Sequence, residues 1–260
     1  MITSRRNPLI QSLRSLTASA RERVEAGLLV VEGSRCLDTA LAFGAEPTAL
    51  LTAAEPRDPD ALRSLVAACA ERWPSCEITE VDREVLAWAV SVQSQVDAVG
   101  IVRRAEHPLP TLTGQVHRAL ILEDLGDPGN VGSCIRSAAA AGADCVVLAG
   151  HCADWSNPKT VRGSAGTVFA LPVTSAAGVA EALAALDLPG IGTDAAGTVL
   201  IHEAGPRERF ALVLGSEVRG LSEGALAACQ ELLAIPMARG VESLNVSAAA
   251  AVCLFQLCRP

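Results

Sequence analysis

Short apolar segments alternate with helix-like segments along most of this chain, and the alternation runs twice. The first run has apolar segments near residues 28–31, 48–52, 77–81 and 98–102. The second run has them at 119–123, 145–149, 168–170, 190–193, 210–214 and 232–235. Strands that alternate with helices indicate an α/β fold, and in the second run a parallel sheet.

The segments between these strands predict the helices. The first helix is expected over residues 5–25, and a later one over 176–186. Residues 103–117 carry charges, two prolines and a glycine without apolar periodicity, which is typical of a linker. We therefore predict a small domain over 1–102, a linker over 103–117 and a parallel-sheet domain over 118–260.

Composition restricts the class of protein further. Half of the residues are apolar and 19% are charged, which is enough apolar material for a buried core. The longest apolar stretches fall far below the roughly 20 residues that cross a bilayer, and no export signal is recognisable, so we expect a cytoplasmic protein. The nine cysteines form no CxxC pair, and we predict reduced, mostly buried thiols and no metal site.

Charge is distributed unevenly. The formal net charge of −8 counts against a nucleic-acid-binding surface, but residues 1–35 carry six arginines against three acids. On charge alone, this cluster is either a solvated helix face or a patch that contacts phosphates. The candidate RNA-binding residues are Arg5, Arg6, Arg14, Arg21 and Arg23.

The loop after the segment 119–123 contains three regularly spaced glycines. Gly126, Gly129 and Gly132 follow the spacing G-x-x-G-x-x-G, which is not the dinucleotide fingerprint G-x-G-x-x-G. A nicotinamide dehydrogenase is therefore disfavoured. A Rossmann-type methyltransferase is disfavoured too, because segment 145–149 does not end in the acidic residue that would hold a cofactor ribose.

Two residues of the following helix are candidates for chemistry. Asn130 is placed to cap the helix, and capping alone could explain it. Arg136 shares a helix face with the small residues Gly132 and Ser133, so a bulky partner could approach its guanidinium. An ordinary surface arginine is the alternative.

Two later loops also follow buried strands, where parallel sheets place their ligands. The strand 210–214 runs into Gly215 and then Glu217, which is either a functional acid or a helix-start acid. The strand 232–235 leads through Gly240 to Ser243, Asn245 and Ser247. Three polar residues within five exceed what capping of one helix requires.

Together these loops resemble the three motifs of the SpoU/TrmH family of RNA ribose 2′-O-methyltransferases, in the SPOUT superfamily. The motifs are Asp-Pro-Gly-Asn-Val-Gly with Arg136, Leu-Gly-Ser-Glu with Gly-Leu, and Ile-Pro-Met with Ser-Leu-Asn-Val-Ser, in that order. Residues 157–166 are similar to the family's Lys-x-x-Arg-x-Ser-x-Gly stretch. Residues 6–35 resemble its RNA substrate-binding domain, so the similarity covers nearly the whole chain. Residues 91–100 depart from the family's Pro-x-Gly turn.

The resemblance implies a fold, a cofactor and partners. We expect a C-terminal domain with a trefoil knot, preceded by a ribosomal-protein-like α/β domain, in a homodimer. The cofactor is expected to be S-adenosylmethionine and the partner RNA, ribosomal RNA in preference to transfer RNA. The implied catalytic residues are Asn130, Arg136, Glu217, Ser243 and Asn245. The implied cofactor-binding residues are Thr193, Gly215, Ile235, Met237, Leu244 and Ser247.

The sequence does not identify the RNA or the nucleotide. A tRNA 2′-O-methyltransferase stays open, and so does a non-catalytic RNA-binding or ribosome-assembly protein on the same fold. Intact Arg136, Glu217 and Asn245 argue against the non-catalytic protein.

Overall fold

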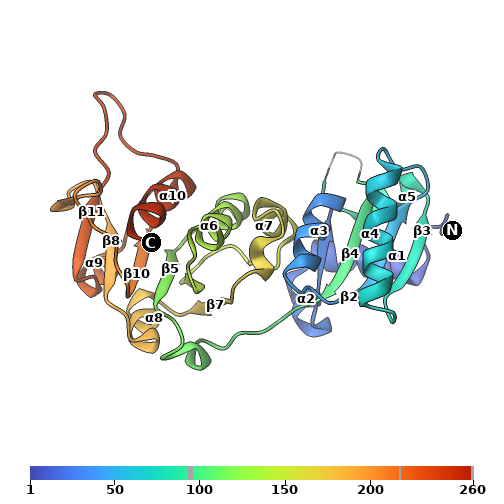
Figure 1. Cartoon of the computed structure of the whole chain (residues 1–260), viewed down its shortest axis with the longest axis horizontal. Coiled ribbons are helices and arrows are strands. Elements are labelled where there is room, and N and C mark those ends of the chain that lie inside the picture. Colours follow the sequence, from blue (N-terminus) through green and yellow to red (C-terminus); the bar gives the residue numbers. More distant parts are fainter. Residues whose placement is uncertain (93–95, 217, 259–260) are drawn as a thin grey trace. The chain divides into compact units, whose positions relative to one another are not determined.

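The chain forms two compact units, each built on its own sheet. The structure, a computed structural model, describes residues 1–92, 96–216 and 218–258. One unit comprises residues 1–105 with 154–170, and the other comprises 106–153 with 171–260 (Figure 1). No helix in the described part of the chain has the length and apolar character needed to cross a membrane.

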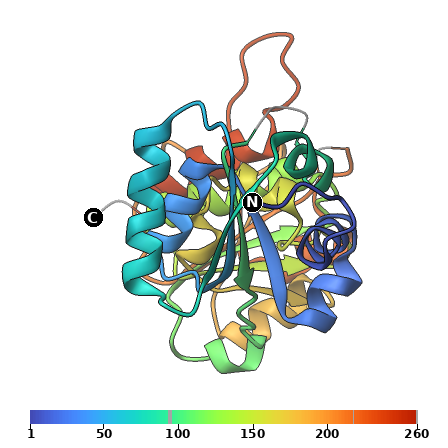
Figure 2. The same cartoon turned by 90° about the vertical axis from the view of Figure 1, so that its right-hand side faces the viewer.

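The first unit is a mixed four-stranded sheet covered by helices. The strand order is β1-β4-β2-β3, with β4 antiparallel to both neighbours and β2 parallel to β3. Helices α1 and α5 pack on one side and α3 and α4 on the other (Figure 2). The elements are α1 (Pro8–Ala18), α2 (Ala20–Ala26), β1 (Leu28–Glu32), α3 (Ser34–Ala42), β2 (Pro47–Ala53), α4 (Pro59–Arg72), β3 (Glu77–Val81), α5 (Arg83–Ala89), β4 (Ala98–Arg103), α7 (Pro158–Gly163) and the 3₁₀ helix η2 (Thr167–Phe169).

The core of this unit follows from strand alternation. Val30, Leu51 and Val99 point to the face that Ile10 and Leu13 of α1 cover, and all five side chains are buried. On the other face, a Cβ at Gly100 would overlap the Leu37 side chain, so glycine lets α3 approach the sheet closely. Burial of each large apolar side chain contributes about 1.5–3 kcal/mol, which makes this core the main source of the unit's stability.

The second unit is a seven-stranded parallel sheet with helices on both faces. The strand order is β7-β6-β5-β10-β8-β11-β9, and every pairing is parallel. Its elements are η1 (Leu109–Leu112), β5 (Arg118–Glu123), α6 (Pro128–Ala141), β6 (Cys145–Ala149), β7 (Val173–Ala176), α8 (Val179–Leu186), β8 (Gly190–Thr193), β9 (Val199–Leu200), β10 (Phe210–Leu214), α9 (Glu223–Ala228), β11 (Glu231–Ala234) and α10 (Val246–Leu257). The predicted α/β class and parallel sheet are confirmed.

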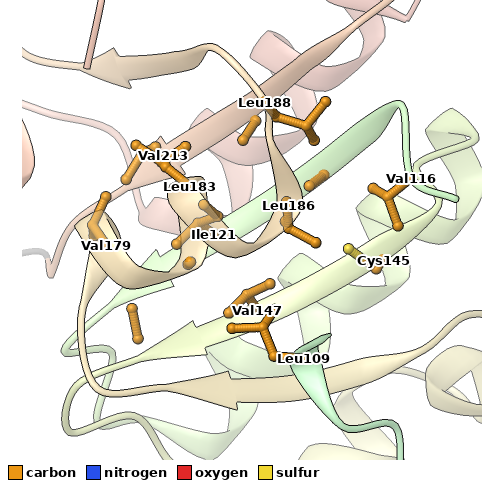
Figure 3. Packing of buried hydrophobic residues seen from close by; sticks show 14 of the residues in the cluster. Leu109, Val116, Ile121, Cys145, Val147, Val179, Leu183, Leu186, Leu188 and Val213 are labelled. Atoms are coloured by element: carbon orange, nitrogen blue, oxygen red, sulfur yellow. The ribbon is translucent and has the colours of Figure 1, made fainter. Parts of the chain in front are cut away.

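The two faces of this sheet have different helices. On one face, α8 and α9 cover Ile121, Val147 and Val213, which contact Leu183 and Leu186 of α8 in a continuous apolar cluster (Figure 3). On the other face, α6 and α10 pack against each other. The small residues of both helices allow this close packing, which brings the start of α6 near the start of α10.

Several predicted helix and strand boundaries differ from the observed ones. The helix expected over 5–25 is two helices, since Ser19 takes an extended conformation and accepts a hydrogen bond from Glu22 N. The helix expected from residue 176 begins at Val179, because Ala176 still belongs to β7. Strand β9 is absent from the sequence prediction; its two residues pair with β11.

The strand expected over 168–170 is wrong, because residues 167–169 form the 3₁₀ helix η2. Gly166, with a φ of +87°, approaches the backbone of α3 so closely that a Cβ would lie 2.5 Å from the Cys36 carbonyl oxygen. The chain turns there, and the strand forms later as β7.

The predicted linker over 103–117 divides between the two units. Arg103 ends β4, whereas Leu109, Leu112 and Val116 are buried in the core of the second unit. The segment 154–170 belongs to the first unit, although its position in the sequence lies well inside the range predicted for the second domain. Long-range contacts that no local pattern signals cause this difference.

Candidate active site

Four neighbouring strands of the parallel sheet end at the same edge and lead into the loops that the sequence singles out. Strands β5, β10, β8 and β11 are adjacent in the sheet. Ligands of open parallel sheets bind beyond the carboxyl ends of the strands. The predicted motifs therefore meet at one edge, although they are spread over more than a hundred residues of sequence.

A cavity of about 390 Å³ opens at the ends of β8 and β11. Its walls include residues 193–195 after β8, residues 235–237 after β11, and residues 242–244 before α10. Four predicted cofactor-binding residues line it, together with the predicted catalytic Ser243: Thr193, Ile235, Met237 and Leu244. Asp194 and Glu242 add two carboxylates to this lining.

Asp194 and Gly197 hold one wall of the cavity, and Gly197 is not among the predicted site residues. Asp194 N donates to the Leu233 carbonyl at 3.0 Å, and its carboxylate accepts from Ala196 N at 2.7 Å. A Cβ at Gly197 would lie 2.6 Å from the Leu233 carbonyl carbon. The loop is therefore fastened to β11. An aspartate directly after a strand, with a glycine three residues later, is the turn signal that could have revealed it.

Gly215 and Ser247 are not among the residues that line the cavity. Gly215 is required by its own turn, because a Cβ there would overlap the Gly220 carbonyl group. Ser247 donates its hydroxyl to Asn245 Oδ1 at 2.6 Å. Both residues shape neighbouring loops in this structure.

The starts of α6 and α10 are joined by a pair of asparagines. Asn245 Nδ2 donates to Asn130 Oδ1 at 3.1 Å. The alternative that Asn130 only caps α6 is excluded, since Asp127 is the cap and accepts from Asn130 N at 3.0 Å. Asn245 caps α10 through Ser247 N at 3.0 Å. Two predicted catalytic residues, 115 positions apart, are thus in direct contact.

Arg136 lies on the exposed side of α6, in the third turn of the helix. Its neighbours Ile135 and Ala138 are buried, so the guanidinium points away from the sheet. It forms no hydrogen bond or ion pair with the residues that the structure describes. Its five N–H donors are available to a ligand. The predicted Glu217 lies outside the described residues.

A buried carboxylate connects the first and second motif loops. Glu123, at the end of β5, accepts from Ser222 N at 2.8 Å and from Ser222 Oγ at 2.7 Å. Ser222 in turn caps α9. Burial, with the Glu123 charge as a second cause, raises the pKa of the Cys229 thiol to about 11. Seven of the nine cysteines are buried, as predicted.

The N-terminal arginines occupy different environments. Arg14 lies 4.6 Å from the Trp88 ring centroid and Arg5 lies 5.6 Å from it, so the indole holds two guanidinium groups at the surface. Arg6 is exposed, and Arg21 is exposed beside Glu25.

Arg23 does not belong to this surface. Its side chain is 2% exposed and donates to Asp154 at 2.6 Å and to Ser156 at 3.0 Å. The Arg23 guanidinium is therefore used inside the protein, and the prediction that it contacts RNA is withdrawn. Removal of one partner from such a buried pair typically costs about 3–5 kcal/mol.

Comparisons with known proteins match these motifs. The family described as "SpoU rRNA Methylase family" matches residues 117–255. A 23S rRNA (uridine(2479)-2′-O)-methyltransferase from Streptomyces viridochromogenes is 30% identical over 99% of this chain and 91% of its own length. An uncharacterized tRNA/rRNA methyltransferase, slr1673 from Synechocystis, is 32% identical over 98% of this chain and 92% of its own.

A solved structure resembles the fold over both units. It is the SpoU methyltransferase AviRb from Streptomyces viridochromogenes in complex with the cofactor AdoMet, with a TM-score of 0.84 and 27% identity. The match covers 96% of this chain and 97% of that one. The similarity is therefore not confined to the parallel sheet.

Proposed function

The chain belongs to the SpoU rRNA methylase family, and from this premise we propose that it transfers a methyl group from S-adenosylmethionine to a ribose 2′-hydroxyl of ribosomal RNA. The observation that carries the proposal is the cavity after β8 and β11, next to which α10 begins at Asn245 and contacts Asn130. The proposed site for the methyl donor and the asparagine side chains that can orient the ribose thus belong to adjoining loops.

The cavity suits the proposed cofactor in its chemistry. S-adenosylmethionine supplies an activated methyl group on a sulfonium. Carboxylates at Asp194 and Glu242 favour a ligand that carries positive charge, and the exposed backbone of residues 235–237 offers hydrogen bonds to a purine edge. We assign Thr193, Ile235, Met237 and Leu244 to direct contact. Gly215 and Ser247 support the site by shaping its loops.

A ribose hydroxyl is a weak nucleophile, so positioning and charge stabilisation must supply most of the rate. We propose that Arg136 grips the phosphate beside the target ribose and stabilises the oxyanion that forms. A guanidinium keeps its proton in proteins and is a poor base, so the proton leaves to that phosphate or to water. Asn130, Asn245 and Ser243 orient the ribose, and Glu217 fixes the loop near Arg136.

RNA selection is assigned to the first unit. Arg5, Arg6, Arg14 and Arg21 are exposed on it, and two of them are fixed against Trp88. Side chains held in advance lose less entropy when they bind phosphates. We propose that this unit is the ribosomal-protein-like RNA-binding domain of the family. Because the substrate is ribosomal RNA, we place the enzyme in the cytoplasm.

We also propose that the second unit is knotted and dimeric. The C-terminal end of α10 contacts the connection before β10, because Arg207 N donates to the Leu257 carbonyl at 2.9 Å and Gln256 donates to the Ala204 carbonyl at 2.6 Å. That placement suits a threaded last segment. Val252 and Phe255 of α10 are 43% and 53% exposed, which suits coverage by a second copy.

The function is tested with the full chain, methyl-labelled S-adenosylmethionine and unmodified transcripts of 23S rRNA and of tRNA. The expected result is one ribose-methylated nucleotide in the rRNA. Label in tRNA alone would favour the tRNA enzyme, and RNA binding without transfer would favour a non-catalytic protein.

The role of Arg136 needs its own variant. We expect Arg136→Lys to slow single-turnover methylation at least tenfold at every pH, because an ammonium group cannot grip a phosphate bidentately. A lysine variant with undiminished rate would overturn the clamp.

A further inference from the structure

The first unit contains a second hollow that no part of the proposed chemistry uses. Its volume is about 570 Å³, and it lies where β1 turns into α3. The sequences that form it are the Glu-Gly-Ser-Arg turn at residues 32–35 and the Lys-x-x-Arg-x-Ser-x-Gly stretch at 159–166, both within this unit. Three arginines line it: Arg35, Arg57 and Arg162.

One of these arginines is fixed by a buried acid. The Glu32 side chain is fully buried and accepts from Arg162 at 2.7 Å, from Ser91 N at 2.6 Å and from Ser91 Oγ at 2.7 Å. The carboxylate is thereby satisfied, and it directs the half-exposed Arg162 guanidinium. In these bonds only Nη1 of Arg162 is used. The group can donate from its other nitrogens to a ligand.

The positive charge of the hollow exceeds its negative charge. Both carboxylates that line it face an arginine, since Glu32 pairs with Arg162 and Asp97 lies 4.0 Å from Arg83. The Arg35 side chain is exposed and forms no ion pair with the described residues. An anion in the hollow therefore meets an arginine whose charge is not neutralised by the protein.

Backbone amides add further hydrogen-bond donors to the hollow. Helix α3 begins at Ser34 after Gly33, and no side chain caps it. Gly33 and Ser34 both line the hollow, so the first-turn amides of α3 border the same space as the arginines. Uncapped amides and the positive end of the helix dipole favour a phosphate.

We propose that this hollow binds a phosphodiester group of the RNA substrate, with Arg35 and the start of α3 as donors and Arg162 as a fixed second cation. The proposal rests on the proposed function, because it names a contact made by the substrate of that enzyme. The hollow shares no residue with the Arg5, Arg14 and Trp88 cluster, and it gives the RNA a second anchor on the first unit. Two separate anchors restrict the orientation of the bound RNA more than one can.

The test measures binding of the full chain to an unmodified 23S rRNA transcript over a range of salt concentrations. Arg35→Gln removes one cation from the hollow, and Arg63→Gln removes one from an exposed site on α4 whose partner is Asp60. We expect Arg35→Gln to weaken RNA binding about tenfold, as for the loss of one charge-assisted hydrogen bond. The slope of log affinity against log salt should fall by about 0.7–0.9. Arg63→Gln should leave both quantities at the wild-type value.

A conservative variant and a second readout keep the result specific. Arg35→Lys should restore the wild-type salt slope, because the charge returns. S-adenosylmethionine affinity should be the same in all variants. If Arg35→Gln binds RNA as tightly as wild type, or if Arg63→Gln loses as much affinity, the hollow is not a phosphate site. These outcomes would overturn the phosphate site alone. The proposed function would fail by a different result, namely that the wild-type chain transfers no methyl group to RNA.

Discussion

Two connections lead into the paired helices α6 and α10, and they are held very differently. The connection after β5 is short, and hydrogen bonds fix it to its surroundings. Glu123 accepts from Ser222, Asp127 caps α6, and Asp124 accepts from His151 N at 2.7 Å. The connection after β11 runs from residue 235 to 245, is exposed along most of its length and projects from the sheet in Figure 1. One side of the proposed site is therefore preorganised by the protein.

The other side, formed by the connection after β11, is expected to become ordered when a ligand or a second copy covers it. Val241 and Leu244 are exposed apolar residues on this second connection, and Leu244 lines the donor cavity. Exposed apolar side chains gain free energy when a ligand or a second copy covers them. The comparison implies that changes at the first connection mainly alter folding stability, and changes around the second mainly alter ligand affinity.

The largest expected effect is at Gly197, which supports the second connection through β11. Gly197→Val should reduce S-adenosylmethionine affinity more than about a hundredfold, since the new side chain meets the β11 backbone and displaces the loop that lines the cavity. Calorimetric titration measures it. Gly178→Ala is the matched control, because a Cβ there meets no atom within 4 Å. Unchanged affinity in Gly197→Val would refute the assigned cavity.

The next effect is at Glu123, in the preorganised connection. Glu123→Gln should lower the free energy of unfolding by about 2 kcal/mol, because a buried acceptor of two hydrogen bonds loses its charge. Chemical denaturation measures this loss. Glu223→Gln, one residue after Ser222 on the exposed start of α9, should cost only a few tenths of a kcal/mol. Equal losses in the two variants would remove the distinction between the connections.

The asparagine pair joins the two connections, and its effect should be smaller. Asn245→Ala should cost about 1 kcal/mol of stability through the lost helix cap, whereas Asn130→Ala should leave stability nearly unchanged. Both should slow methylation, by about tenfold each. In a double-mutant cycle of single-turnover rates, the two losses should not add, and full additivity would show that the 3.1 Å contact has no catalytic role.

Outside the two connections, the Arg23–Asp154 pair of the first unit gives an effect on stability that depends on pH. Desolvation raises the pKa of Asp154, but the hydrogen bond from Arg23 and those from Ser156 outweigh it and hold the pKa below its ordinary value. A carboxylate with a lowered folded-state pKa adds stability above its unfolded pKa and loses it as pH falls through the folded value. The contribution should therefore begin to fall near pH 4, the unfolded pKa, and disappear at lower pH, below the folded pKa. Thermal melts of wild type and Asp154→Asn should converge in acid; a constant difference would contradict the assignment.

Local patterns predicted much of the fold and most of the motif loops. Cys145–Ala149 and Phe210–Leu214 have the predicted bounds, because the apolar run of each buried strand is encoded in adjacent residues. The family that the motifs resemble is confirmed by the match over residues 117–255. Thr193, Ile235 and Leu244 line one cavity, and their contact with a cofactor stays a prediction.

The remaining features depend on partners distant in the sequence. Arg23 has the pattern of a surface arginine, but Asp154, 131 residues later, holds it inside the protein. Asp127 caps α6 because Pro128 starts the helix, a local signal in the sequence, whereas the contact of Asn130 with Asn245 joins residues 115 positions apart. Gly197 matters because β11 passes beside it, which no periodicity reveals.

The central claim is that Arg136 and the cavity after β8 and β11 act together on ribosomal RNA. The most direct test maps ribose 2′-O-methyl groups in rRNA from cells that carry the intact gene and from cells that carry only Arg136→Ala. We predict that one methylated position in the rRNA disappears in the variant while the protein persists at its normal level. An unchanged methylation map would contradict the account.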